Sequence, residues 1–373
     1  MPALQPHPKQ ERIINMKIIN IVGARPQFIK YFPISNAIVR FNIQTDARIN
    51  DVLVHTGQHY DYNMSKIFFD GFSMKVPDYY LCVGSGTHGR QTAEILKKTE
   101  EVLFEERPDV VIVYGDTNST LGGMLAAVKL HIPVAHVEAG LRSFNKYMPE
   151  EINRILTDHI STYLFCSSEN AVKQLKIEGI TNGINTGDVM YDVLLNAKEI
   201  AEKKSDIIDS LGLREKEYGV LTIHRPENTD NIEKFKEIIS FVNSVANDKE
   251  IIFPMHPRSM NIYNDYFIKH TFADNIKIID PVSYFDSIML LKNSKLLLTD
   301  SGGMQKEAYW LKVPCITLRE ETEWTETVES GWNILYKDYS GSHKINGSQG
   351  LLYGDGHAAD KIINILETGF INE

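Results

Sequence analysis

The sequence predicts an α/β protein built from two Rossmann-like, doubly wound domains that face a cleft. Short apolar runs alternate with amphipathic stretches from Met16 onward, which is the pattern of a parallel sheet with helices on both faces. The pattern restarts after a charged stretch at residues 196–219, which we interpret as a polar linker between two similar halves. The length of 373 residues also fits two domains at about 150 residues each.

The first domain is expected to contain five strands. Their apolar runs are typical of strands buried on both faces and are residues 17–22, 52–56, 110–115, 133–138 and 162–167. Residues 91–106 and 118–130 lie between these runs and have helical periodicity. The second domain repeats the arrangement, with runs at residues 219–224, 251–256, 276–280, 295–300 and 314–318.

The end of the chain is expected to be a surface loop followed by a docked helix. Residues 339–356 are rich in Gly and Ser, which is typical of a loop. From Asp360 to Phe370 apolar residues recur on one helical face. We therefore divide the chain into a disordered extension (1–15), an N-terminal domain (16–190), a C-terminal domain (191–356) and a C-terminal helix (357–373).

Composition excludes several classes of function. Lys and Arg total 39 while Asp and Glu total 49, which gives a net charge of −10. Such a chain lacks the basic field that nucleic acid or an anionic membrane surface requires. The N-terminus lacks the apolar core of a signal peptide, and no run is apolar enough to span a membrane. The three cysteines do not have the spacing of a metal site and cannot all pair, so a disulfide framework is not expected. We expect a cytoplasmic protein without nucleic-acid or membrane partners.

The turn after the first strand is a candidate anion site. Ligands of open parallel sheets bind beyond the carboxyl ends of the strands. Gly23 permits a tight turn there, and Pro26 suits the first turn of a helix. Arg25 and Lys30 place two cations beside that helix N-terminus, which favours an anion. The alternative is an ordinary strand–helix turn with two solvated cations.

A second candidate anion site follows the strand at residues 295–300. Ser301, Gly302 and Gly303 leave backbone N–H groups open at a helix start, which suits a phosphate. Glu307 comes about two turns later and is placed to accept hydrogen bonds from ribose. Neither half has a G-x-G-x-x-G sequence that opens a helix after its first strand. The expected ligand is therefore a mononucleotide diphosphate, held by cations and helix ends without a metal or other cofactor.

Acidic residues gather at the strand ends of the first half. They are Asp116, Glu138 and the pair Glu150–Glu151. Each alone fits a helix cap or a first-turn acid, but three in one domain, with His224 and His256 in the other, favour acid/base chemistry. Arg154 is four residues after Glu150 and is expected to share its helix face and orient its carboxylate.

These motifs together resemble the non-hydrolysing UDP-N-acetylglucosamine 2-epimerases, metal-free enzymes of the glycosyltransferase-B fold. The matching segments are GARPQFIK (23–30), TGQH (56–59), YGDTNST (114–120), HVEAGLRS (136–143), PEEINRILTDH (149–159), HRPEN (224–228), HPR (256–258), TDSGG (299–303) and LREETE (318–323). The resemblance implies catalytic acids in the N-terminal domain, UDP in the C-terminal domain, a C-terminal helix that packs on the N-terminal domain, no cofactor, and a homodimer.

The resemblance also implies residue roles. The essential carboxylates and histidine would be Asp116, Glu138, Glu150 and His224, supported by Arg154. The diphosphate-side cations would be Arg25 and Lys30. The phosphate and ribose contacts would be Ser301, Gly302, Gly303 and Glu307. The positions that receive a second UDP-sugar as an allosteric activator in several bacterial members would be Gln58, Arg90, Gln91, Arg225 and His256.

Three motifs depart from the family pattern. The usual G-T-R-P-E has Gln27 at its last position, and the usual H-R-R-E-N has Pro226 at its third. The usual T-E-R-P-E has Trp324 in place of arginine. The G-A-R-P-Q and T-E-W patterns resemble the subgroup that epimerises UDP-2,3-diacetamido-2,3-dideoxyglucuronic acid. Trp324 is therefore the expected specificity residue.

The implied reaction converts UDP-GlcNAc to UDP-ManNAc for surface polysaccharide precursors. It proceeds by anti elimination of UDP to 2-acetamidoglucal, followed by readdition of UDP and protonation of the other face of C2. The alternatives are the same reaction on the diacetamido glucuronate, a metal-independent glycosyltransferase of the same fold, and a non-catalytic UDP-sugar sensor. A transferase normally needs one base and a sensor needs none, so the cluster of three acids favours the epimerase.

Overall fold

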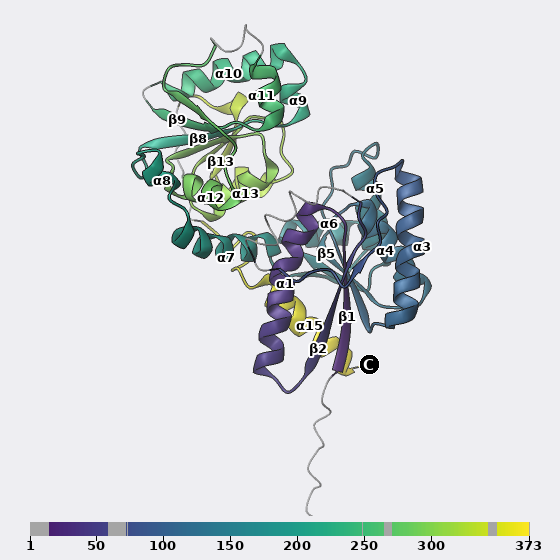
Figure 1. Cartoon of the computed structure of the whole chain (residues 1–373). Helices are drawn as coiled ribbons and strands as arrows, with labels where there is room; N and C mark the ends of the chain where they lie inside the picture. The colour runs from purple at the N-terminus through teal and green to yellow at the C-terminus, as the bar shows by residue number, and fades with distance from the viewer. Residues whose placement is uncertain are drawn as a thin grey trace, which may run out of the picture. The chain divides into compact units, whose positions relative to one another are not determined.

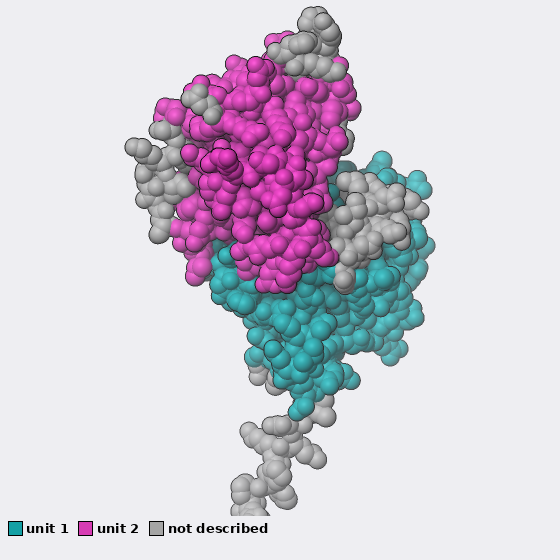
Figure 2. All heavy atoms as spheres, turned by 60° about the vertical axis from the view of Figure 1, so that its left-hand side comes forward, with its two compact units in different colours: residues 1–193, 353–373 teal, residues 194–352 magenta. Residues whose placement is uncertain are grey.

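The computed structural model describes residues 15–58, 72, 74–247, 249–264, 271–341 and 349–372. The chain forms two compact units: Met1–Val193 with Tyr353–Glu373, and Leu194–Leu352 (Figure 2). The divisions therefore fall within a few residues of the expected 190/191 and 356/357. The expected disordered extension lies outside the described residues, except for Asn15, which is the first residue of a strand.

The described part of unit 1 contains a seven-stranded parallel sheet in the order β3-β2-β1-β4-β5-β6-β7. The strands are β1 (Asn15–Val22), β2 (Arg48–His55), β3 (Tyr79–Tyr80), β4 (Val110–Tyr114), β5 (Val134–Ala139), β6 (Tyr163–Cys166) and β7 (Gly183–Asn185). The chain builds outward from β1 to β3 and then returns to β4 on the other side of β1. The five predicted strands are confirmed, whereas the short edge strands β3 and β7 were not expected.

Helices cover both faces of this sheet (Figure 1). They are α1 (Arg25–Gln44), α3 (His88–Glu106), α4 (Asn118–Lys129), α5 (Pro149–Ile160), α6 (Glu169–Ile177) and α15 (Ala358–Asn372). The side chains of α1 and α15 share one apolar core with the sheet, and those of α3 and α4 share another. The predicted C-terminal helix is α15, whose Ile362, Ile363 and Leu366 are buried. Arg40 of α1 pairs with Asp360 of α15 at 2.6 Å.

The described part of unit 2 contains a six-stranded parallel sheet in the order β10-β9-β8-β11-β12-β13. The strands are β8 (Tyr218–Thr222), β9 (Glu250–Pro254), β10 (Ile276–Ile279), β11 (Leu296–Thr299), β12 (Cys315–Thr317) and β13 (Asn333–Leu335). The helices include α9 (Pro226–Thr229), α10 (Ile232–Ala246), α11 (Pro257–Tyr263), α12 (Tyr284–Asn293), α13 (Gly302–Trp310) and α14 (Thr325–Glu329). The five predicted strands are again confirmed, and β13 at the edge was not expected.

The predicted polar linker is helical. It is covered largely by α7 (Val189–Lys204) and α8 (Ile207–Ser210). Val193, Ala197 and Ala201 of α7 are fully buried, at the spacing of four that places them on one helix face. The charges of the stretch therefore belong to the outer face of an amphipathic helix.

Two further observations concern the surface. In the part of the chain that the structure describes, no helix is long and apolar enough to cross a membrane. The predicted surface loop at residues 339–356 lies partly outside the described residues, and its described portions contain neither helix nor strand.

Candidate active site

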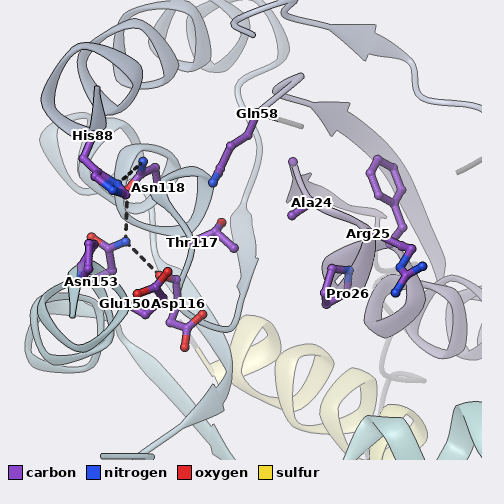
Figure 3. Close-up of a pocket in the computed structure, with 13 residues that line it drawn as sticks. Ala24, Arg25, Pro26, Gln58, His88, Asp116, Thr117, Asn118, Glu150 and Asn153 are labelled. Carbon is purple, nitrogen blue, oxygen red and sulfur yellow. Dashed lines mark hydrogen bonds between the residues drawn. The ribbon is translucent and has the colours of Figure 1, made fainter. Parts of the chain in front are cut away.

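A cavity of about 360 Å³ opens in unit 1 at the point where the strand order reverses. The loops that follow β1 and β4 diverge there, because α1 and α4 cover opposite faces of the sheet. Figure 3 shows its two walls: Ala24, Arg25 and Pro26 at the start of α1, and Asp116 with Glu150 opposite them. Ligands of doubly wound sheets bind at such reversal points.

The loop after β1 is fixed by Gln27. Gln27 is buried, and its Oε1 accepts hydrogen bonds from the backbone N–H groups of Gly23 at 2.8 Å and Ala24 at 3.1 Å. Its Nε2 donates to the carbonyl of Tyr114 at 2.7 Å and to Thr120 Oγ1 at 2.9 Å. Gln27 therefore ties the turn after β1 to the end of β4. A glutamate lacks the Nε2 donor, which gives this departure from the family pattern a structural reason.

Gly23 is required by close packing. A Cβ at this position would lie 2.0 Å from Ser119 Oγ and 2.2 Å from Thr56 Oγ1. Those two hydroxyls are themselves 2.8 Å apart. The loop after β1 therefore lies directly against α4 and the end of β2, which places Arg25 on the cavity wall.

Arg154 supports Asp116 and Glu151 rather than Glu150. Its guanidinium donates to Asp116 Oδ2 and, at 2.8 Å, to Glu151 Oε2. Glu151 also accepts hydrogen bonds from the backbone N–H groups of Ser143 and Phe144 at 2.9 and 2.8 Å. Burial raises the pKa of Glu151, but these hydrogen bonds and Arg154 outweigh it and lower the pKa.

The predicted pairing of Glu150 with Arg154 is therefore wrong. The loop before α5 draws Glu151 inward, so Arg154 follows Glu151 at a spacing of three rather than Glu150 at a spacing of four. Glu150 lines the cavity instead and has no ion-pair partner among the described residues.

Glu138 and Lys30 form a partly buried ion pair beside Gly115. The Nζ of Lys30 donates to Glu138 Oε2. Burial lowers the pKa of Lys30, but Glu138 and then Asp116 raise it by more, so the pKa lies above its usual value. A Cβ at Gly115 would lie 3.2 Å from Glu138 Oε2 and 3.3 Å from Lys30 Nζ, so glycine leaves room for the pair.

The backbone of Glu138 is strained. Its φ is +76°, in the left-handed region, and the register between β5 and β6 shifts between Val137 and Ala139. Non-glycine residues held in this region are unfavourable and are found at functional sites when the surrounding structure enforces them. The irregularity in β5 turns the Glu138 carboxylate toward Lys30 and Gly115.

His136 is an important residue that the sequence reasoning missed. It is fully buried in β5, its Nδ1 lies 2.7 Å from Asp158 Oδ1, and its Nε2 lies 2.7 Å from the carbonyl oxygen of Gly115. A carbonyl only accepts, so Nε2 carries a hydrogen. Asp158 also accepts from Arg142 at 2.6 Å. Burial raises the pKa of Asp158, but His136 and Arg142 lower it by more. This network anchors the turn that carries Asp116.

A chain of amides forms the rest of the Asp116 wall (Figure 3). Asn153 Nδ2 donates to the backbone carbonyl of Asp116 at 2.8 Å and to Asn118 Oδ1 at 3.3 Å. Asn118 Nδ2 lies 3.1 Å from His88 Nδ1 and 2.7 Å from Gln91 Oε1. His88, Asn118 and Asn153 were not predicted, because nothing in their local sequence distinguishes them from surface amides and a helix-start histidine.

The residues predicted as allosteric do not lie together in one unit. Gln58 lines the same cavity as Asp116 and accepts from Ser119 N–H and Oγ at 2.9 and 2.6 Å. Arg90 and Gln91 line a separate cavity of about 330 Å³ at the start of α3. Arg225 and His256 belong to unit 2. Gln58 and Gln91 are both buried and hydrogen-bonded, so they also have a structural role.

In unit 2 the strand order reverses between β8 and β11, and Asp300 organises the turns there. It is fully buried and accepts hydrogen bonds from the backbone N–H groups of His224 at 3.0 Å and Arg225 at 2.9 Å. Its Oδ1 is also 3.3 Å from His224 Nδ1. The centre of the His224 imidazole ring lies 5.5 Å from the centre of the His256 ring. Asp300 was not assigned a role from the sequence, although it directly precedes the predicted phosphate loop.

The predicted phosphate loop forms the start of α13. Ser301 is the N-cap residue, and its Oγ accepts from Met304 N–H at 3.4 Å. A Cβ on Gly302 would lie 2.5 Å from Glu323 Oε1 and 3.0 Å from Trp324 Nε1. Gly303 is open, since its nearest neighbour would be Ser301 Oγ at 4.0 Å. A Cβ at Gly302 would therefore displace the side chains of residues 323–324, whereas Gly303 is exposed and has open space on its Cβ side.

Glu307 lies deeper along α13. It accepts a hydrogen bond from Tyr284 Oη at 3.0 Å, and burial raises its pKa to about 7. A hydroxyl donor lowers the pKa of a carboxyl, so a ribose hydroxyl at this position would favour the ionised form. Among the described residues, no group of three or more His, Cys, Asp or Glu side chains is arranged to hold a metal ion.

Comparison with known proteins places these features in a family. The family model for UDP-N-acetylglucosamine 2-epimerase matches residues 42–367. This chain belongs to that family. It is 51% identical to a UDP-N-acetylglucosamine 2-epimerase homolog of Methanococcus maripaludis, over 94% of this chain and 99% of that protein. It is 43% identical to the UDP-2,3-diacetamido-2,3-dideoxy-D-glucuronate 2-epimerase of Pseudomonas aeruginosa, over 94% and 99% respectively.

The fold agrees with a solved epimerase. The crystal structure of the Methanocaldococcus jannaschii UDP-GlcNAc 2-epimerase with UDP-GlcNAc and UDP superposes with a TM-score of 0.78 at 44% identity, covering 95% of this chain and all of that one. The predicted family and the predicted two-sheet, glycosyltransferase-B fold class are therefore confirmed.

Proposed function

We propose that this protein is a UDP-sugar 2-epimerase that interconverts UDP-GlcNAc and UDP-ManNAc. The observation that carries the proposal is the gathering of Asp116, Glu150 and Arg25 on one cavity at the carboxyl edge of unit 1, in a chain of the epimerase family. The M. jannaschii relative was solved with UDP-GlcNAc and UDP, which supports a nucleotide sugar as the ligand.

The first step is an anti elimination. A carboxylate removes the proton from C2, the C2–H electron pair forms the C1–C2 double bond of 2-acetamidoglucal, and UDP leaves with the C1–O pair. Positive charge builds at C1 and the ring oxygen, and negative charge builds on the diphosphate. We assign stabilisation of the positive charge to Glu138, because its carboxylate is held in a partly buried ion pair with Lys30.

The second step reverses the first on the other face of C2. A diphosphate oxygen of UDP adds to C1 while an acid delivers a proton to C2, so one face needs a base and the other an acid. We assign these two positions to Asp116 and Glu150, which both line the cavity. Asp116 is supported by Arg154 and Glu150 is not, so the two carboxyl groups are electrostatically distinct.

We assign UDP to unit 2. The exposed Gly303 and the N-terminus of α13 suit a phosphate, and the buried Asp300 orients His224 beside that turn. Glu307 is the ribose acceptor in this assignment. Arg25, which lines the cavity of unit 1, supplies a cation there for an anionic ligand.

A second candidate substrate is UDP-2,3-diacetamido-2,3-dideoxyglucuronic acid. Trp324 and Gln27 favour it, because both depart from the usual family pattern, and the P. aeruginosa enzyme that is named for this sugar is a relative at 43% identity. The reaction would be the same, with different contacts at C3 and C6 of the sugar.

We further propose a cytoplasmic homodimer that makes polysaccharide precursors and binds a second UDP-sugar near Arg90. An apolar stripe on and beside α5 supports the dimer: Met148, Ile152, Leu156 and Ile160 recur every four residues and are 37–48% exposed. The cavity beside Arg90 and Gln91 supports the second ligand. Sedimentation of the whole chain tests the dimer.

The substrate is tested by proton NMR of the whole chain incubated with each UDP-sugar in turn, with and without a chelator. We expect the 2-epimer of UDP-GlcNAc to form in both conditions. Faster turnover of the diacetamido glucuronate by more than tenfold would replace the first-choice substrate with the second. Conversion of neither sugar into its 2-epimer would contradict the proposal.

A further inference from the structure

A buried lysine lies directly beneath the predicted specificity residue. Lys306 of α13 is 3% exposed, and its Nζ lies 3.8 Å from the centre of the Trp324 ring and 5.7 Å from the centre of the Trp310 ring. An ammonium group over an indole face is a cation–π contact, which strengthens when water is excluded. Neither the reaction steps nor the family motifs above give Lys306 a role.

The stack lies along one face of α13. Gly302, Lys306 and Trp310 are four residues apart, so they share a face of the helix. Trp324 contacts this face at two places: its ring covers the ammonium of Lys306, and its Nε1 lies 3.0 Å from where a Cβ of Gly302 would be. The indole therefore extends from Lys306 toward the N-terminus of α13, with its N–H edge at the first residue of the helix.

We propose that Lys306 is a positioning residue that makes Trp324 part of the diphosphate site. Its ammonium fixes the plane of the indole, so that the indole N–H is presented at the N-terminal turn of α13, where an anion also interacts favourably with the helix dipole. Lys306 lies about 6 Å along the helix from Gly302. Its charge adds to that of Arg319, which pairs with the Glu323 carboxylate at the same turn.

This pairing accounts for the departure at position 324. The family pattern has an arginine there, which would bring a cation and several N–H donors. Trp324 has one N–H and no charge, and the Lys306 ammonium provides the missing charge from the neighbouring helix. The inference rests on the proposed function only in taking the ligand to be a UDP-sugar.

The test measures UDP affinity by calorimetry and epimerisation kinetics for four variants of the whole chain. Lys306→Met keeps an unbranched, slightly shorter side chain and removes the charge, and Lys306→Arg restores a cation that stacks on indole. Trp324→Phe keeps a ring face for Lys306 and removes the N–H. Lys295→Met, at an exposed lysine of the same unit, is the control. Circular dichroism and thermal melting establish that each variant is folded.

We expect Lys306→Met to weaken UDP binding and raise KM by at least tenfold, with kcat changed less than threefold. Lys306→Arg should recover UDP affinity to within threefold of the unsubstituted chain, Trp324→Phe should lose at least fivefold, and Lys295→Met should lose nothing. A double-mutant cycle between Lys306→Met and Trp324→Phe should be non-additive in UDP affinity, because Lys306→Met misplaces the same indole N–H that Trp324→Phe removes.

Three results would overturn the inference. The first is unchanged UDP affinity in folded Lys306→Met, which would leave the stack with a structural role only. The second is unchanged affinity in Trp324→Phe, which remains decisive if Lys306→Met does not fold. The third is absence of UDP binding by the unsubstituted chain. If the unsubstituted chain binds UDP but does not epimerise either sugar, the proposed function fails while this inference still stands on its own binding data.

Discussion

Replacing Trp324 with arginine restores the usual family residue, yet we expect the change to destabilise this protein. The new guanidinium would occupy the place of a ring whose centre is 3.8 Å from Lys306 Nζ. Two like charges at that separation repel by about 4 kcal/mol at an effective dielectric constant of about 20. Loss of the cation–π attraction adds about 2 kcal/mol at a desolvated site.

The arginine side chain is long enough to bend away from Lys306, so the net loss should be smaller than this sum. We expect Trp324→Arg to lower the free energy of unfolding by about 3 kcal/mol, or the melting temperature of unit 2 by about 6–12 °C. Lys306→Glu combined with Trp324→Arg replaces the repulsion with an ion pair and should recover most of the loss.

The assay is thermal and urea unfolding of the two single variants, the double variant and Trp324→Phe, which retains the ring face. Strong non-additivity between positions 306 and 324 is the expected outcome. A Trp324→Arg variant within about 0.5 kcal/mol of the original chain, the range of neutral surface changes, would show that the two side chains are not energetically coupled. So would a double variant no more stable than Trp324→Arg alone.

Three further predictions concern unit 1. Turnover should fall at least about 100-fold in each of the variants Asp116→Asn, Glu138→Gln and Glu150→Gln. Their affinity for UDP, measured by calorimetry, should stay within twofold of that of the unsubstituted chain. Near-normal turnover in any two of the variants would refute these assignments. Gln27→Glu removes the donor to the carbonyl at the end of β4 and should lower the free energy of unfolding by about 1–3 kcal/mol at pH 7. Because the buried new carboxyl should have a raised pKa, this loss should be absent below about pH 4, where the carboxyl is protonated. Equal losses in the urea midpoint at pH 7 and pH 4 would contradict this. Asp158→Asn removes the carboxylate that accepts from buried Arg142 and lies 2.7 Å from His136 Nδ1, and it should destabilise by about 3–5 kcal/mol. Because the pKa of Asp158 is lowered in the fold, its stabilisation is present above the unfolded value of about 3.9 and is lost as pH falls through the lower folded pKa. A stability–pH curve with the same acid limb in both proteins would be the contrary result.

The central strands were predictable from sequence and the edge strands were not. β1 and β4 are buried on both faces, so their apolar runs are continuous. β3 has two residues, and β7 and β13 have three each, with partly exposed side chains, so no run marks them. α7 was taken for a linker because its exposed lysines and glutamates dominate the composition of residues 196–204.

The candidate site was predictable in the same partial way. The carboxyl ends of parallel strands meet at one edge, so strand-end positions alone indicate that Arg25 and Asp116 come together, as they do on the cavity. The partners that hold them come from distant segments: Arg154 reaches Asp116 across 38 positions, and Lys306 stacks on Trp324 from another helix. Local spacing rules cannot find such pairs, and they selected Glu150 for Arg154 wrongly.

The most direct test of the account is the fate of the C2 hydrogen of UDP-GlcNAc. The whole chain is incubated with this sugar in deuterated water, and proton NMR and mass spectrometry follow C2 in both epimers, with Glu150→Gln as the comparison. We predict that every molecule of UDP-ManNAc formed carries deuterium at C2, and that the variant forms it at least about 100-fold more slowly. An epimer that keeps its original C2 proton would contradict elimination through the glucal and the roles given to Asp116 and Glu150.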